Sequence, residues 1–412
     1  MEVGEERSRR ALGWIAVAAL GTLVSGVVYL RPSLAPPAAA TPAASARVAQ
    51  PGSTWRLASA SFGDADHGTV VFHSSGPAPT TSFLTSDGGK TWELAVRAPR
   101  NGYASSVFLD TTTVVAQTVS SLGPASAEPF ATRISHHAGR TWRQLADPRH
   151  NPGSGWPVFL DPQHAWWIDR APSPDPHTPV AVWRTSDGGT TWHDLVASDL
   201  PVTGFPGQPV FTDPLHGAML LTSPDATQSA VATSDGGGSW REVTAPEVPV
   251  HATRLESGVL LRHGHRLLFW LPAVTPLGGP LIDYMPFVSV SRDGGQTWSP
   301  ARPAPNIVQP WYVGLYPALD DRGRLLVLDD RRLWISEDDG ATWAARLKQV
   351  PAELRLAMLV STTPGALYAT AVQTGPLGVV TPGTPLTLIR STDGGAHWSV
   401  VALPRPPLDH SR

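Results

Sequence analysis

Short runs of alternating apolar and polar residues fill most of this chain, and turns rich in aspartate and glycine separate them. Runs such as "FLT", "VWRT" and "TLIRS" precede an octet of the type "TSDGGKTW", and its tryptophan opens another run, as in "TWELAV". Runs of this length between Asp-Gly turns are typical of β-strands joined in hairpins. The pattern predicts an all-β fold.

The octet recurs seven times, and its final tryptophans are 45 to 58 residues apart. The seven copies end at Trp92, Trp142, Trp192, Trp240, Trp298, Trp343 and Trp398. A repeat of this length corresponds to one four-stranded propeller blade. We therefore expect a seven-bladed β-propeller of four-stranded antiparallel blades over residues 52–403, with a tail at 404–412. The letters "GSTW" at 52–55 resemble half an octet, so this segment either pairs with the last blade to close the ring or is the remnant of an eighth unit.

Each octet has the chemistry of a tight hairpin turn. A short carboxylate can accept hydrogen bonds from the loop amides, and the glycine two residues later can adopt backbone angles that a Cβ would forbid. The carboxylates are Asp87, Asp187, Asp235, Asp293, Asp338 and Asp393. The tryptophan that follows is large enough to fill the gap between adjoining blades. In the second octet His137 replaces the aspartate, and in the last His397 replaces the threonine, so we expect these turns to be looser.

A second, weaker repeat lies upstream of most octets and reads as another hairpin, as in "FLDPQHAWWI" at 159–168 and "FTDPLHGAML" at 211–220. Each blade then holds strands A to D, with the octet between C and D. His67, His164 and His216 occupy equivalent turns of different blades. Equivalent turns lie far apart in a ring, so these histidines are expected to stabilise turns and not to bind a metal.

The first fifty residues have a different character. Residues 11–30 contain no charge and are long enough to cross about 30 Å of hydrocarbon. Arginines precede this stretch, so we expect residues 1–10 in the cytoplasm, one transmembrane helix at 11–30, a Pro/Ala-rich linker at 31–51 and a propeller outside the cell membrane. The alternative is a cleaved signal peptide, for which 44–46 offers small residues, and the propeller would then be secreted.

The net charge and the absence of cysteine exclude several classes of function. The net charge of −3 leaves no basic surface for a nucleic acid, and the absence of cysteine excludes disulfides, thiolate metal sites and iron–sulfur clusters. We expect neither a metal nor another cofactor.

The octets resemble the Asp box of BNR (bacterial neuraminidase repeat) propellers. With the upstream hairpin, they are similar to photosystem II stability/assembly factor-like propellers and related exported proteins. Resemblance to sialidases, which share the box, implies an Arg-Ile-Pro motif and an arginine triad, but only Arg56 precedes the first box in a matching segment. Resemblance to xyloglucanase-type glycosidases implies a carboxylate pair. The candidates for that pair are Asp169, Asp283, Asp320, Asp321 and Asp329.

The boxes mark the face of the propeller that carries the A–B and C–D turns, and variation between repeats is concentrated in the opposite set of connections. Pro-rich insertions between strands B and C are expected at 169–180, 271–287 and 374–385, and D-to-A connections carry aromatic residues. These aromatic residues either pack among the connections that cover the hydrophobic core or contact a ligand. The candidate ligand contacts are Tyr103, Trp156, Asp169, Arg170, Phe205, Asp283, Tyr284, Trp311 and Tyr312.

The leading hypothesis is a membrane-tethered, non-enzymatic binding or assembly scaffold. Its protein or glycan ligand would bind on the face opposite the boxes. The alternative hypothesis is a glycoside hydrolase, sialidase-like or xyloglucanase-like, that acts on extracellular glycans.

Overall fold

The computed structural model describes residues 55–404 apart from 75–79, 98–101, 121–129, 149–156, 171–179, 196–204, 223–227, 245, 247–253, 256–257, 279–280, 311–315, 330–331, 348, 352, 364 and 374–385. The expected cytoplasmic segment, transmembrane helix and nearly all of the linker and tail lie outside these residues. Within the described ranges, no helix has the length and hydropathy that a membrane span requires.

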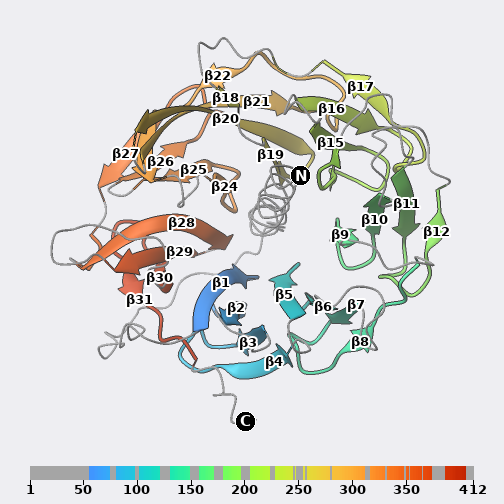
Figure 1. The fold of residues 1–412 in the computed structure, drawn as a ribbon, viewed down its shortest axis with the longest axis horizontal. Helices are drawn as coiled ribbons and strands as arrows, with labels where there is room; N and C mark the ends of the chain where they lie inside the picture. The colour runs from blue at the N-terminus through green and yellow to red at the C-terminus, as the bar shows by residue number, and fades with distance from the viewer. Residues whose placement is uncertain are drawn as a thin grey trace, which may run out of the picture.

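The described strands form seven sheets arranged in a ring (Figure 1). Blade 1 contains β1 (Trp55–Phe62), β2 (Gly68–Ser74), β3 (Thr81–Thr85) and β4 (Glu93–Arg97); blade 2 contains β5 (Gly102–Phe108), β6 (Val114–Ser120), β7 (Phe130–Ser135) and β8 (Arg143–Gln144). Blade 3 contains β9 (Pro157–Phe159), β10 (Ala165–Arg170), β11 (Val180–Thr185) and β12 (His193–Asp194); blade 4 contains β13 (Phe205–Pro206), β14 (Val210–Phe211), β15 (Gly217–Thr222), β16 (Gln228–Thr233) and β17 (Arg241–Val243). Blade 5 contains β18 (Arg254–Leu255), β19 (Val259–His263), β20 (Arg266–Gly278), β21 (Leu281–Ser291), β22 (Arg302–Pro303) and β23 (Ile307–Pro310). Blade 6 contains β24 (Ala318–Leu319), β25 (Leu325–Leu328), β26 (Arg332–Ser336) and β27 (Ala344–Leu347); blade 7 contains β28 (Leu354–Thr363), β29 (Ala366–Gln373), β30 (Leu386–Ser391) and β31 (Ser399–Val400).

The seven-bladed, four-stranded antiparallel architecture is confirmed. Five blades consist of four consecutive strands, with the first strand nearest the centre of the ring (Figure 1). In blades 4 and 5 the innermost strand is split into two pieces that pair with the same neighbour, and in blade 5 β23 also pairs with β21. Each octet joins the third and fourth strands of its blade, as the sequence predicted.

The ring closes by side-chain contact between blade 7 and blade 1. The segment from Trp55 onward is the inner strand of blade 1 and pairs with β2, so the expectation that it pairs with the last blade was wrong. The ring of Phe62 stacks on Tyr368 with centroids 3.5 Å apart, and the Tyr368 hydroxyl donates to the Ala65 carbonyl at 2.7 Å. Ser361 Oγ also donates to the Phe62 carbonyl at 3.0 Å.

Hydrophobic clusters lie at the boundaries between blades. The described part of the chain contains one such cluster at each of the seven boundaries. Every box tryptophan takes part in the cluster that its blade shares with the preceding blade; Trp240 is 7% exposed and Trp398 is 5% exposed. The prediction that these indoles lie between the blades is confirmed, and each adds its buried ring area to the aliphatic and aromatic side chains of the boundary cluster.

The expected Pro-rich insertion at 271–287 is instead part of a regular hairpin. Strands β20 and β21 run through it, with only 279–280 between them outside the described residues. Pro272 lies directly opposite Pro286, and the strands stay paired on both sides of them, at Leu271 with Phe287 and Ala273 with Met285. The insertion therefore lengthens blade 5 instead of forming a loop.

Candidate functional site

The octet turns use their polar groups internally. In the third blade, Asp187 Oδ1 accepts from the amides of Thr190 and Thr191 at 2.9 Å, and its Oδ2 accepts from the Thr191 hydroxyl at 2.6 Å. Gly188 and Gly189 have φ angles of 71° and 81°, where a side chain would be strained. Hydrogen bonds from Thr191 hold the pKa of Asp187 well below its usual range. A carboxylate held ionised in this way cannot serve as a general acid near neutral pH.

The hairpin turn between the first two strands is built in the same way and is tied to the octet. Asp161 Oδ1 accepts from the amides of Gln163 and His164 at 2.8 and 2.9 Å, and His164 Nδ1 lies 3.0 Å from Asp161 Oδ2. The amide of Gly188 then donates to the Gln163 carbonyl at 2.8 Å. Burial alone would raise the pKa of Asp161, but these hydrogen bonds outweigh it and lower the pKa.

The same histidine–aspartate pair occurs in blades 1 and 4. His67 Nδ1 lies 2.9 Å from Asp64 Oδ2, and His216 Nδ1 lies 3.0 Å from Asp213 Oδ2. Each histidine therefore bonds the aspartate of its own turn, as expected for a residue that stabilises the turn.

The two altered octets keep the turn conformation. In the second, His137 Nδ1 lies 2.8 Å from the Thr141 hydroxyl, and the amide of Gly139 donates to Ser135 Oγ at 2.9 Å. In the last, the amide of His397 donates to Asp393 Oδ1 at 2.9 Å and its ring bonds the other carboxylate oxygen. The last octet thus keeps the contacts of its aspartate, whereas in the second octet His137 makes one side-chain hydrogen bond where Asp87 accepts four.

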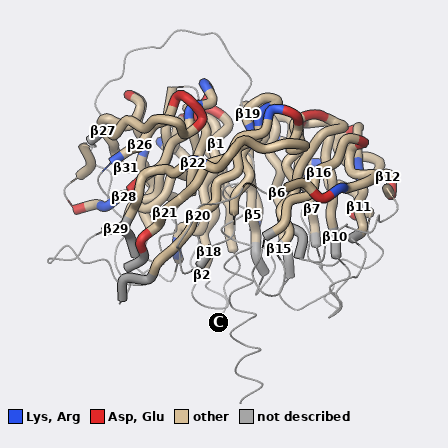
Figure 2. Tube along the Cα trace, turned by 90° about the horizontal axis from the view of Figure 1, so that it is seen from above, with Lys and Arg blue, Asp and Glu red and all other residues tan. Residues whose placement is uncertain are grey.

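The face that carries these turns holds many carboxylates together with arginines, and some of these groups pair: Arg292 with Asp339, and Arg324 with Asp320. Figure 2 shows most of the acidic segments of the tube gathered along one edge of the ring. The six box aspartates and the A–B turn aspartates lie there, and their oxygens already accept hydrogen bonds from the turns. A ligand on this face would have to compete with bonds that hold the blades in shape.

On the opposite face, most of the predicted contacts lie outside the described residues. Trp156, Trp311 and Tyr312 belong to connections outside them, and the side chains of Tyr103 in β5, Asp169 and Arg170 in β10 and Phe205 in β13 are also outside. Two candidates on β21 are described. Tyr284 is 1% exposed and belongs to the cluster between blades 5 and 6, whereas the adjacent Asp283 is half-buried.

Two arginines on this opposite face were missed as candidates for a site. Arg56 is the second residue of β1 and is exposed; Arg355 is the second residue of β28 and is half-buried. Both strands are innermost in their blades, and because their ends meet the A–B turns, their starts lie on the face opposite the boxes. Aligning the seven repeats at the start of strand A would have revealed these equivalent positions.

Comparison with known proteins agrees with this architecture. A family model described as BNR/Asp-box repeat matches residues 289–300, which is the octet of blade 5 with its flanks. The chain is a seven-bladed propeller, and its blade 5 octet is similar to an Asp-box repeat. No curated protein matches this Asp-box propeller.

Three solved structures are similar to this chain at low sequence identity. YCF48 bound to D1 peptide is 18% identical, with 89% of this chain and 88% of that chain covered and a TM-score of 0.34. The α-L-arabinofuranosidase Arb93A from Fusarium graminearum, in complex with an iminosugar inhibitor, is 13% identical, with 70% and 92% covered and a TM-score of 0.43. The β-propeller domain of the Trilobed protease from Pyrococcus furiosus, which has an open velcro topology, is 8% identical, with 86% and 100% covered and a TM-score of 0.50. At these identities the likeness is one of fold.

Proposed function

We propose that this chain is an exported, membrane-tethered propeller that acts as a non-enzymatic binding scaffold, and that its ligand is an acidic protein segment bound on the face opposite the Asp boxes. The observation that carries the proposal is the contrast between the two faces. The aspartates of the box face already accept hydrogen bonds within their turns, whereas Arg56 and Arg355 stand at the opposite ends of neighbouring inner strands. Positive side chains at a channel mouth attract carboxylates and orient them.

The ligand class is chosen on this charge pattern. YCF48 is seen with a peptide and Arb93A with an iminosugar inhibitor, so ligands of both kinds occur on propellers. A carboxylate forms stronger hydrogen bonds with the exposed Arg56 guanidinium than a neutral sugar does, because charge-assisted hydrogen bonds are the stronger ones. The lengthened hairpin of blade 5, which carries the half-buried Asp283, adds a wall on the same face.

Binding to a library of short peptides, sorted by net charge, tests the ligand class. The full chain would be held in lipid nanodiscs because residues 11–30 are apolar. We expect acidic peptides to be enriched and Arg56→Glu to weaken their binding by about tenfold or more. Arg302→Glu, which reverses an exposed charge on the outer strand β22, is the matched control and should leave the enrichment unchanged. Equal effects of the two variants would contradict the proposed site.

The same preparation tests the hydrolase hypothesis. Release of product from a panel of polysaccharides and sialoglycans, abolished by Asp283→Asn, would establish a glycosidase in place of a scaffold.

Export is tested separately. A phosphatase that is active only outside the cytoplasm would be fused after residue 51, and an inactive fusion protein would contradict export.

A further inference from the structure

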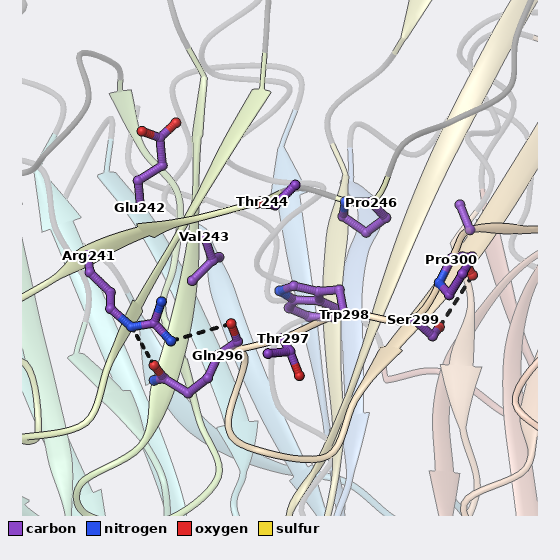
Figure 3. Close-up of a pocket in the computed structure, with 11 residues that line it drawn as sticks. Arg241, Glu242, Val243, Thr244, Pro246, Gln296, Thr297, Trp298, Ser299 and Pro300 are labelled. Atoms are coloured by element: carbon purple, nitrogen blue, oxygen red, sulfur yellow. Dashed lines mark hydrogen bonds between the residues drawn. The ribbon is translucent and has the colours of Figure 1, made fainter.

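A cleft of about 620 Å³ opens on the outer rim between blades 4 and 5 (Figure 3). One wall is formed by β17 with Thr244 and Pro246, and the other by residues 296–301 of blade 5. The cleft lies where the outermost strand of blade 5 starts late. In the other six blades this strand begins directly after the box tryptophan, but β22 begins at Arg302, four positions after Trp298.

The sequence "TWSPARP" explains the delay. Pro300 has no N–H group to donate to the ladder, so the chain leaves β21 after Ser299 and pairs again only where Arg302 lies opposite Val288. Ser299 keeps the start of the segment in place, because its amide donates to the Val290 carbonyl at 2.9 Å and its hydroxyl accepts from the Val290 amide at 3.0 Å. Trp298 is partly exposed, as are the box tryptophans of blades 1, 2, 3 and 6, and here the displaced chain adds a cleft beside it.

Trp298 is held rigidly within the cleft. Its ring lies edge-on to Phe269 with centroids 5.8 Å apart, and it packs on the cluster between blades 4 and 5. Figure 3 shows the indole between Pro246 and Thr297, with Ser299 and Pro300 to one side and the Arg241–Gln296 pair to the other.

The polar groups beside the indole are also fixed. Arg241 Nε donates to Gln296 Oε1 at 2.7 Å and its Nη2 donates to the Gln296 carbonyl at 3.4 Å. Gln296 Nε2 in turn donates to the Thr233 carbonyl at 3.0 Å. These bonds set the plane of the guanidinium group and leave its Nη1 as a donor among the described contacts.

We propose that this rim cleft binds a neutral oligosaccharide, whose apolar C–H face stacks on Trp298 and whose hydroxyls bond Arg241 and Thr244. The indole of Trp298 can stack on an apolar ligand face, and the polar side chains beside it, such as Arg241 and Gln296, can bond hydroxyl groups at the edge of the ligand. Arg241 and Glu242 balance each other, which favours a neutral ligand. A proline-rich peptide would need a groove lined by several aromatic rings, and Trp298 is the only aromatic residue among the described residues that line the cleft. The volume falls within the range of about 300–1,000 Å³ typical of small-ligand sites.

Binding of cellohexaose, xylohexaose and mannohexaose to the full chain in lipid nanodiscs tests the proposal, with hexaproline as the competing class. Ligand-observed NMR and calorimetry would measure Kd. We expect at least one of the three oligosaccharides to bind, and Ala301→Trp, which fills the cleft from its wall without removing a contact, to weaken that binding about tenfold or more. Ala345→Trp makes the same change on the exposed outer strand β27 and should leave Kd unchanged within about twofold.

Several results would overturn the proposal: no binding of any oligosaccharide to the unaltered chain, the same loss in both alanine variants, no loss in Ala301→Trp, or binding of hexaproline alone. Thermal unfolding of each variant shows whether it folds, and Arg241→Met, which keeps the apolar stem, provides a second test. Arg56→Glu should not affect oligosaccharide binding, so failure of this site and failure of the proposed peptide site can be told apart.

Discussion

The boundary between blades 7 and 1 and the boundary between blades 4 and 5 are built from the same repeat but end differently at the outer rim. At the first, Trp92 Nε1 donates to the Ala402 carbonyl at 2.7 Å, and Val401 and Leu403 pack beside it. At the second, Trp298 Nε1 has no hydrogen-bond partner among the described residues, and the chain turns away at Pro300. The box tryptophan packs on the hydrophobic cluster at both boundaries, but only at the first of the two does a segment outside the repeat, residues 401–403, cover it at the rim.

The largest effect is expected at the sealed boundary. Tyr368 has 0% exposure and stacks on Phe62, so Tyr368→Ala should lower the free energy of unfolding by about 3–5 kcal/mol. Denaturant unfolding followed by fluorescence measures the change. Tyr368→Phe removes only the bond to Ala65 and should cost about 1 kcal/mol. If the two variants were equally stable, stacking would not be what closes the ring.

The octet aspartates of blades 1 and 5 should contribute equally to the free energy of unfolding. Asp87 and Asp293 each accept from a hydroxyl at 2.8 Å, an amide at 2.9 Å and a second hydroxyl at 2.6 Å. Substituting either with alanine should cost about 1–2 kcal/mol, the usual cost of losing a turn-capping carboxylate that is open to water. Unfolding free energies that differed by more than about 1 kcal/mol between the variants would show that the boxes are not uniform.

The indole nitrogens provide a smaller and more specific comparison. Trp92→Phe loses the hydrogen bond to Ala402, whereas Trp298→Phe loses no described hydrogen bond. Both variants lose the same ring area, because each replaces an indole with a phenyl ring. The free energy of unfolding of Trp92→Phe should therefore be lower than that of Trp298→Phe by about 1 kcal/mol in denaturant unfolding. The opposite order would mean that the cleft depends on Trp298 more than the sealed rim depends on Trp92.

The smallest effect concerns acid stability at an octet away from both boundaries. Burial alone would raise the pKa of Asp393, but hydrogen bonds from His397 and Ser391 lower it to about 2. Since the folded pKa is below the unfolded one, this stabilisation is complete above about pH 4 and is lost as pH falls towards 2. The stability difference between the unaltered chain and Asp393→Asn should therefore shrink over that interval. A constant difference from pH 6 to pH 2 would contradict the lowered pKa.

The octets made the blade architecture predictable because their chemistry is local. Asp187 and Trp192 sit where the sequence placed them, in the turn and at the blade boundary. The lengthened blade 5 was not predicted, because prolines normally indicate a loop and their position opposite each other at Pro272 and Pro286 depends on strand register. The cleft at Trp298 could have been predicted from the sequence. Of the seven segments that follow an octet, only "TWSPARP" has a proline two residues after the tryptophan.

The sequence by itself determined the number of blades, the position of each C–D hairpin and the role of each box tryptophan. These features depend on hydrogen bonds that span a few residues and on a repeat long enough to form one blade. Only the tertiary structure decided how the ring closes and which rim position stays open. Those outcomes depend on contacts such as Phe62 with Ser361 and Trp92 with Ala402, whose partners are 299 and 310 residues apart in the chain. No local pattern encodes such a pair, because it exists only when all seven blades have packed in order.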